Sequence, residues 1–218
     1  MNPIYRNIDA TDWITLIFIA GLIIIWLAKY LFQSRFLNFI ILPFNNKYLS
    51  LYNKKGKLLN WFHVFMSLFQ LLNLSLFLFL AKQLLSENAK NNHVDTFLLL
   101  LTIVALYHLV KITLQLVKGY VFNTHNLVME LIYNKLSYLN YSSMILFLSN
   151  ILLVYVWKDN LIIFYATFFL IALINGIGAF NILKNNQKLI LANIFYFILY
   201  LCTLEIAPFV IIGSYLKQ

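Results

Sequence analysis

Long apolar runs that recur along the chain limit its fold more than any other feature of the sequence. Six such runs, separated by polar connections, lie at residues 13–32, 61–80, 96–116, 143–157, 161–183 and 189–215. A bilayer has a hydrocarbon core of about 30 Å, which a helix of roughly 20 apolar residues can cross. Because 62% of the residues are hydrophobic and the mean hydropathy is +0.82, the sequence predicts a single all-α polytopic transmembrane domain, residues 1–218, with about six transmembrane helices.

Two connections contain segments that are too short or too polar to cross a bilayer. In the first connection an apolar stretch ends at Pro43, and in the third, residues 121–141 place apolar side chains at helical spacing between Asn134, Lys135 and other polar residues. Both patterns are typical of amphipathic helices that lie at the membrane surface. Residues 158–160 are the whole connection between the fourth and fifth runs, so these two runs are predicted to form an antiparallel hairpin.

Basic residues are distributed unevenly between the two sides of the membrane that these spans define. The odd-numbered connections and adjoining span ends hold Lys29, Arg35, Lys47, Lys54, Lys55, Lys57, Lys111, Lys118, Lys135, Lys184 and Lys188. The opposite side holds Arg6, Lys82, Lys90, Lys158 and Lys217. By the positive-inside rule, the odd connections are cytoplasmic and both termini are predicted to face outward. The formal net charge of +9 therefore reflects topology, and we expect the lipid bilayer rather than nucleic acid as a partner.

The sequence offers little material for a metal site or a catalytic centre. Cys202 is the sole cysteine, so no intrachain disulfide and no site built on several cysteines can form. Haem or metal binding would need two histidines at matched depth, which His63 and His108 would reach only by chance of packing. The sequence has no nucleophile elbow, no His-Glu-x-x-His motif and no glycine-rich phosphate loop. We expect no metal, no cofactor and no enzymatic activity.

The most costly residue of the predicted spans is Glu205, a carboxylate well inside the last apolar run. Pro208 follows three residues later, where a proline removes a backbone hydrogen bond and bends a helix. An intramembrane carboxylate either marks a proton or ion path or fixes a helix contact by hydrogen bonding. Its predicted partners are His108 and Lys111, which lie on one face of the third span. By helix rise Lys111 is about 10 Å from the cytoplasmic edge and Glu205 roughly 20 Å, so His108 is the closer in depth.

The fifth run carries a ridge of small residues formed by Ala172, Gly176 and Ala179. Small residues allow membrane helices to approach closely, and a neighbouring amide can hydrogen-bond across the interface. Asn175 with Gly176 is therefore a predicted helix-packing site.

The last span contains the block YLCTLEIAP at residues 200–208. With this block, and more loosely back through LVKGYVFN at residues 116–123, the chain resembles a family of multi-pass inner-membrane proteins of Bacteroidota that is catalogued as a domain of unknown function. The resemblance implies that the positions that matter are Tyr200, Cys202, Thr203, Glu205 and Pro208. It also implies association with a protein complex that is restricted to the same lineage. The apparatus for type 9 protein secretion and gliding motility is the leading candidate.

Two functions follow as expectations. The first is a non-enzymatic subunit or accessory factor of a larger envelope complex, in contact with other integral membrane protein subunits. The second is a small transporter or proton-coupled channel in which Glu205, helped by His108, binds a proton or cation near mid-membrane.

Overall fold

The computed structural model of the chain describes residues 12–44, 47–52, 60–85, 94–121, 125–158 and 160–185. The chain divides into two compact units, Met1–Gly178 and Ala179–Gln218. The helices are α1 (Asp12–Leu31), α2 (Gln33–Ile40), α3 (Lys47–Tyr52), α4 (Trp61–Leu85), α5 (Val94–Val121), α6 (His125–Ile151), the π-helical turn η2 (Leu152–Val156) and α7 (Leu161–Asn185). The predicted all-α fold class is confirmed.

Five helices of the described part are long and apolar enough to cross a membrane. They are Asp12–Leu31, Trp61–Leu84, Val94–Val121, Val128–Val156 and Leu161–Asn181. By helix length and hydropathy, the chain is a multi-pass membrane protein. The run at residues 189–215 lies outside the described residues, so its helix remains a prediction, as does the single domain.

Helix α6 corrects the prediction that residues 121–141 form a surface helix separate from a span at residues 143–157. A single helix covers His125–Ile151 and continues into η2, which closes with a 2.8 Å bond from Trp157 N to Leu152 O. The segment contains no proline or glycine that would interrupt the helix. The polar residues of this segment predicted that it lies among the lipid headgroups. Many of them are instead buried in the bundle, among them Asn134, Ser137, Asn140, Ser142 and Ser143.

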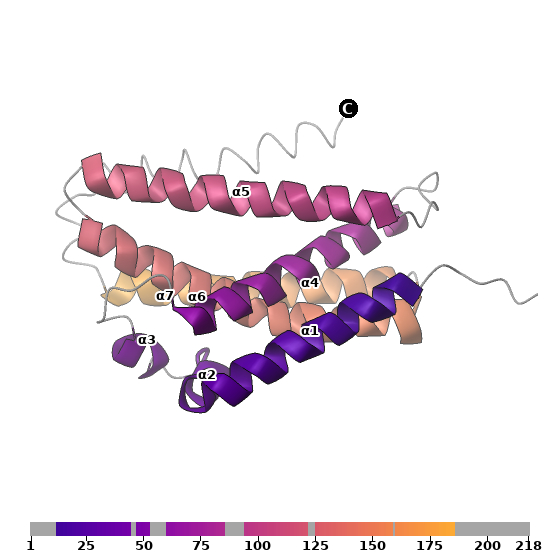
Figure 1. The fold of residues 1–218 in the computed structure, drawn as a ribbon, viewed down its shortest axis with the longest axis horizontal. Helices are drawn as coiled ribbons and strands as arrows, with labels where there is room; N and C mark the ends of the chain where they lie inside the picture. Colours follow the sequence, from indigo (N-terminus) through magenta and orange to yellow (C-terminus); the bar gives the residue numbers. More distant parts are fainter. Residues whose placement is uncertain are drawn as a thin grey trace, which may run out of the picture. The chain divides into compact units, whose positions relative to one another are not determined.

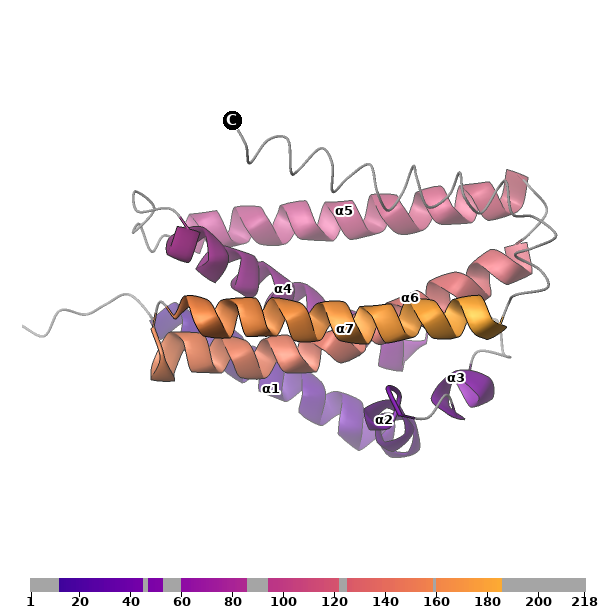
Figure 2. The same ribbon diagram turned by 180° about the vertical axis from the view of Figure 1, so that it is seen from behind.

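Helices α4 and α6 form the centre of the first unit. Helix α4 packs against α1, α5 and α6, and α5 also packs against α6; Figure 1 shows α4 passing obliquely between α1 and α5. In the opposite view α6 and α7 run side by side (Figure 2). Half of the most apolar window of α4 and of α6 is buried (50% each), against 11% for α5 and 17% for α7. The described part of the chain therefore leaves most of the apolar surface of α5 and α7 uncovered.

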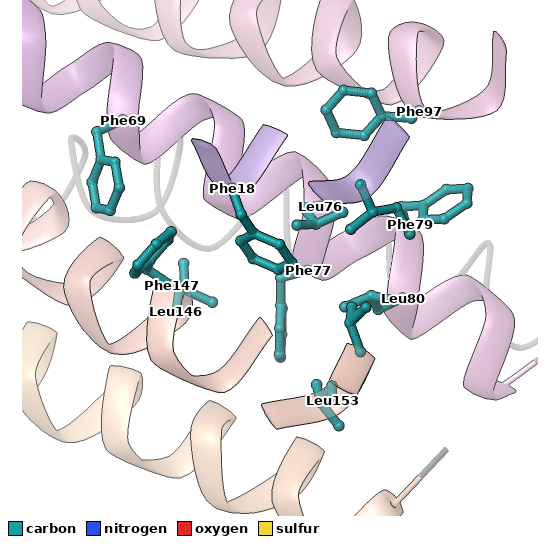
Figure 3. Close-up of a cluster of buried hydrophobic side chains, with 12 residues drawn as sticks. Phe18, Phe69, Leu76, Phe77, Phe79, Leu80, Phe97, Leu146, Phe147 and Leu153 are labelled. Carbon is teal, nitrogen blue, oxygen red and sulfur yellow. The ribbon is translucent and has the colours of Figure 1, made fainter. Parts of the chain in front are cut away.

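An apolar cluster fills the interior beside α4 (Figure 3). Phe69 of α4 lies against Phe147 of α6, with ring centroids 5.4 Å apart, and Phe77 stacks on Phe164 of α7 at 5.0 Å. Phe18 of α1 meets the edge of Phe147 at 5.7 Å. These aromatic contacts hold α1, α4, α6 and α7 together, because side-chain packing rather than the hydrophobic effect joins helices inside lipid.

The short helices α2 and α3 lie in the first connection. Phe36 and Phe39 of α2 are buried, whereas Leu37 and Ile40 are exposed, so α2 has one face on the bundle and one apolar face outside it. Helix α3 follows and places Tyr48 in the interior. The connection thus supplies a polar group to the core.

A buried polar seam as the candidate functional site

A row of polar side chains lies on one face of α4. His63, Ser67 and Gln70 are spaced by four and three residues, which is the spacing of neighbours on a helix surface. Their hydrogen-bonding partners come from three other helices and are Tyr48, His108 and Asn140, and Tyr133 in turn bonds to Tyr48. We call these seven residues the polar seam.

At the end of the seam nearest the start of α4, an imidazole and two phenols form a chain of hydrogen bonds. The Tyr133 hydroxyl donates to the Tyr48 hydroxyl oxygen over 3.3 Å, and Tyr48 Oη lies 3.1 Å from His63 Nε2. The Tyr133 ring also meets the edge of the His63 ring, with centroids 4.4 Å apart. These contacts link α3, α4 and α6, and all three side chains are buried.

The Tyr48 phenol is held in its neutral form. Burial raises the pKa of Tyr48 above its ordinary value of 10.0, and the nearby Arg35 guanidinium opposes this only in part. Arg35 lies over the ring of Tyr52, with Cζ 4.9 Å from the ring centroid, so its charge is stabilised by an aromatic face. Tyr48 therefore keeps its proton and can donate it in a hydrogen bond.

Further along the seam, Gln70 of α4 meets His108 of α5. Gln70 Nε2 lies 3.3 Å from His108 Nε2, and His108 Nδ1 lies 3.0 Å from the Val104 carbonyl oxygen. The carbonyl can only accept, so Nδ1 carries the ring proton and Nε2 accepts from the amide. Gln70 is nine residues from Trp61, about 14 Å along the helix, and His108 is near the middle of α5. The pair is thus close to mid-membrane.

Asparagine side chains connect α4 to α6 on both sides of Gln70. Asn140 Nδ2 donates to Ser67 Oγ over 3.4 Å, and Asn150 Nδ2 donates to the backbone carbonyl of Asn73 over 3.0 Å. Both asparagines of α6 are fully buried. Buried amides that bond across helices fix the register of membrane helices.

Four buried polar atoms in and beside the seam have no hydrogen-bond partner among the described residues. They are His63 Nδ1, Gln70 Oε1, Asn140 Oδ1 and Asn150 Oδ1. A buried polar group without a partner costs about 1–3 kcal/mol, and such groups are usually satisfied by ordered water or by a bound group. These four atoms can therefore form hydrogen bonds to small polar molecules such as water.

His108 and Lys111, the two predicted partners of Glu205, have different environments. His108 is in the seam, whereas Lys111 donates to the hydroxyl of Tyr107 in its own helix over 3.3 Å and lies 5.4 Å from that ring. Within the described ranges no ion pair to Lys111 is seen. The phenol gives the ammonium group a polar partner inside an apolar helix.

The two residues of the predicted packing site on α7, Asn175 and Gly176, have different surroundings. Asn175 Nδ2 donates to Ile171 O of its own helix over 2.9 Å, and a Cβ atom at Gly176 would meet no described atom within 4 Å. The close helix contact occurs instead at Gly178, where a Cβ atom would lie 2.5 Å from Cγ of Tyr138. Within the described part of the chain, α7 is thus uncovered at Gly176 and packed at Gly178.

The block in the last apolar run falls outside the described residues. This concerns Tyr200, Cys202, Thr203, Glu205 and Pro208. Their roles stay predictions, as does the pairing of Glu205 with His108.

Sequence reasoning missed most of the seam. It identified His108 as a site residue, but Tyr48 and Tyr133 carried no signal, since tyrosines near span ends are common interface anchors. One signal was present on α4, where His63, Ser67 and Gln70 recur at helical spacing in an apolar run. A polar stripe within a span indicates a face that is turned to protein.

Comparison with known proteins gives one match. The model of a family described as a domain of unknown function, DUF4271, matches residues 14–216. Neither the curated proteins nor the solved structures include a significant match. Because the matched segment covers nearly the whole sequence, the chain belongs to the DUF4271 family.

Proposed function

We propose that the chain is a non-enzymatic subunit or accessory factor of a larger envelope complex, embedded in the bacterial inner membrane with both termini in the periplasm. The machinery for type 9 protein secretion and gliding motility in Bacteroidota is the leading candidate. The proposal assigns the free faces of the bundle to other integral membrane subunits.

The observation that carries this proposal is the open face of α7. Ala172 and Gly176 are one turn apart and both are exposed, and Gly176 has space around its Cα that the described part of the chain does not fill. Small residues at this spacing allow a second membrane helix to approach closely. The same helix already packs in this way at Gly178, against Tyr138 of α6.

A pull-down in mild detergent from the source cell tests the proposal. Gly176→Leu fills the open position, and we expect it to reduce recovery of partner subunits by about tenfold, the effect of roughly 1.4 kcal/mol. The matched control is Ala166→Leu, at an exposed position of α7 roughly 80° around the helix from Gly176. Equal recovery of all partners with wild type and Gly176→Leu would refute this face as the interface.

A second comparison concerns Glu205. Glu205→Gln keeps the shape and hydrogen bonding of the side chain and removes its titratable proton. Loss of partners from this variant would make Glu205 an assembly contact. If no partner is recovered with either chain, the subunit proposal fails.

The polar seam favours a second candidate, a small transporter or proton-coupled channel that uses Glu205 and His108. The seam runs from the start of α4 to mid-membrane and contains buried polar atoms without a partner in the described part of the chain. Polar groups inside a bundle are costly and are commonly retained along ion and proton paths. In this candidate Glu205, helped by His108, binds a proton or cation near mid-membrane.

A further inference from the structure

The hydrogen bonds of the tyrosine and histidine side chains at the start of the seam have a defined direction. Tyr133 donates to Tyr48, and Tyr48 has one proton of its own to donate. Its other neighbour is His63 Nε2, so the imidazole nitrogen accepts. A neutral imidazole with an accepting Nε2 carries its proton on Nδ1.

The Nδ1 proton of His63 is the free end of this chain. Nδ1 is fully buried and has no acceptor among the residues that the structure describes, and the His63 side chain is only 2% exposed. The next polar groups on the same face of α4 are Ser67 and Gln70. Ser67 accepts from Asn140, and the carbonyl oxygens of Asn140 and Gln70 are buried acceptors without a donor in the described ranges.

The buried donor is therefore followed by two buried acceptors, Asn140 Oδ1 of α6 and Gln70 Oε1 two turns further along α4. Ordered water molecules satisfy such groups in protein interiors and can bridge them. Gln70 leads on to His108, near the middle of α5. Polar groups thus recur on one face of α4 from near its start to mid-membrane.

We propose that Tyr133, Tyr48 and His63 form a proton relay that delivers protons from the α3 end of the bundle to the mid-membrane part of the polar seam. This inference rests on the second candidate function, proton-coupled transport. It adds an entrance to the path and names the three side chains that carry the proton through it.

Each transfer in the relay conserves protons. Tyr133 passes its hydroxyl proton to Tyr48 while Tyr48 passes its own to His63 Nε2, and His63 releases its Nδ1 proton to a water molecule beside Asn140. A proton from the aqueous side restores Tyr133, so one proton has moved and only O–H and N–H bonds have changed. Rotation of the two hydroxyl groups and a half-turn of the imidazole ring about its Cβ–Cγ bond, which exchanges the places of Nδ1 and Nε2, reset the chain. Concerted transfer avoids a long-lived buried charge, which would be costly.

Proton flux into vesicles tests the relay. The purified full chain is reconstituted into phosphatidylethanolamine and phosphatidylglycerol vesicles containing a pH-sensitive dye, and a potassium diffusion potential drives proton entry. We expect wild type to acidify the lumen faster than empty vesicles, and Tyr48→Phe and His63→Gln to reduce the rate to that of empty vesicles. His125→Gln, at an exposed histidine of α6, is the matched control and should keep the wild-type rate.

The outcomes separate the relay from the function on which it rests. Flux in wild type that persists unchanged in Tyr48→Phe and His63→Gln would overturn the relay and leave proton transport standing. No flux above that of empty vesicles in wild type would overturn both.

A second measurement is independent of the folding of any variant. Nitrogen-15 NMR of histidine-labelled wild type reports which ring nitrogen of His63 carries the proton. We expect the Nδ1–H tautomer, and an Nε2–H tautomer would overturn the relay direction.

Discussion

Gly178 of α7 packs so closely on Tyr138 of α6 that a Cβ atom at residue 178 would lie 2.5 Å from Cγ of the tyrosine ring. Real Cβ atoms essentially never approach a neighbour this closely. Two residues earlier, Gly176 would meet no described atom within 4 Å. One helix thus has one glycine that is required by the bundle and one that leaves a surface open.

This contrast predicts different effects of the same substitution. Gly178→Ala forces the two helices apart or rotates the Tyr138 ring, and we expect it to lower the free energy of unfolding by about 1–3 kcal/mol, the usual cost of overpacking. Gly176→Ala should change it by less than about 0.5 kcal/mol. Reversible unfolding in mixed detergent micelles gives both values. Equal destabilisation by the two variants would refute the assigned faces of α7.

The asparagines of the bundle allow a second pairwise comparison. Asn150 donates across the interface to the Asn73 carbonyl, whereas Asn175 donates within α7. Asn150→Ala should therefore cost about 1 kcal/mol, within the range of interhelical hydrogen bonds in membranes. Asn175→Ala should cost only a few tenths of a kcal/mol. The same unfolding titration measures both, and a larger loss for Asn175→Ala would contradict the account.

Tyr48 predicts a dependence of stability on high pH. Burial raises the pKa of its phenol above 10.0 in the folded chain, so above this pH the unfolded chain loses the phenolic proton while the folded chain retains it. The stability that the neutral phenol contributes is thus present below about pH 10 and is lost as the pH rises further. Between about pH 8 and pH 11, Tyr48→Phe should lose less stability than wild type.

Tyr30→Phe is the control for this titration, since the Tyr30 side chain is 73% exposed. It should lose as much stability as wild type over the same interval. The idea of a buried Tyr48 phenol is wrong if Tyr48→Phe and Tyr30→Phe follow the same pH curve.

The distribution of lysines and arginines predicts the orientation of the chain. In a Cys202→Ser background, a cysteine in place of Lys55 should be protected from an impermeant thiol reagent in intact cells, and one in place of Lys158 should react. The reverse pattern would place the termini in the cytoplasm. It would also exchange the sides between which the proton relay is proposed to run.

The length of the apolar runs made the helices predictable from the sequence. The run at residues 13–32 corresponds to α1 (Asp12–Leu31), and the run at residues 161–183 to α7 (Leu161–Asn185). Lipid imposes this correspondence, because backbone polar groups inside it must be bonded within the helix. The side-chain oxygen Oδ1 of Asn160 accepts hydrogen bonds from Ile162 N and Ile163 N. This cap begins α7 close to the predicted position.

The role of polar residues in α6 was not predictable in the same way. Asn140 and Ser143 give the same sequence pattern whether they face lipid headgroups or another helix. Only the position of α4 in the fold decides between these two environments. The contacts that form the seam join residues far apart in sequence, such as Tyr48 and Tyr133. Periodicity in a single segment contains no information on such pairs.

The most direct test of the central claim, that the chain is a subunit of an envelope complex, is its native size at its natural level of expression. Membranes are extracted in mild detergent, and the chain is followed by native electrophoresis and mass spectrometry of the band. We expect a band far above that of the 25.6 kDa monomer with its detergent, and we expect it to contain defined membrane partners. A stable monomer without partners would contradict it.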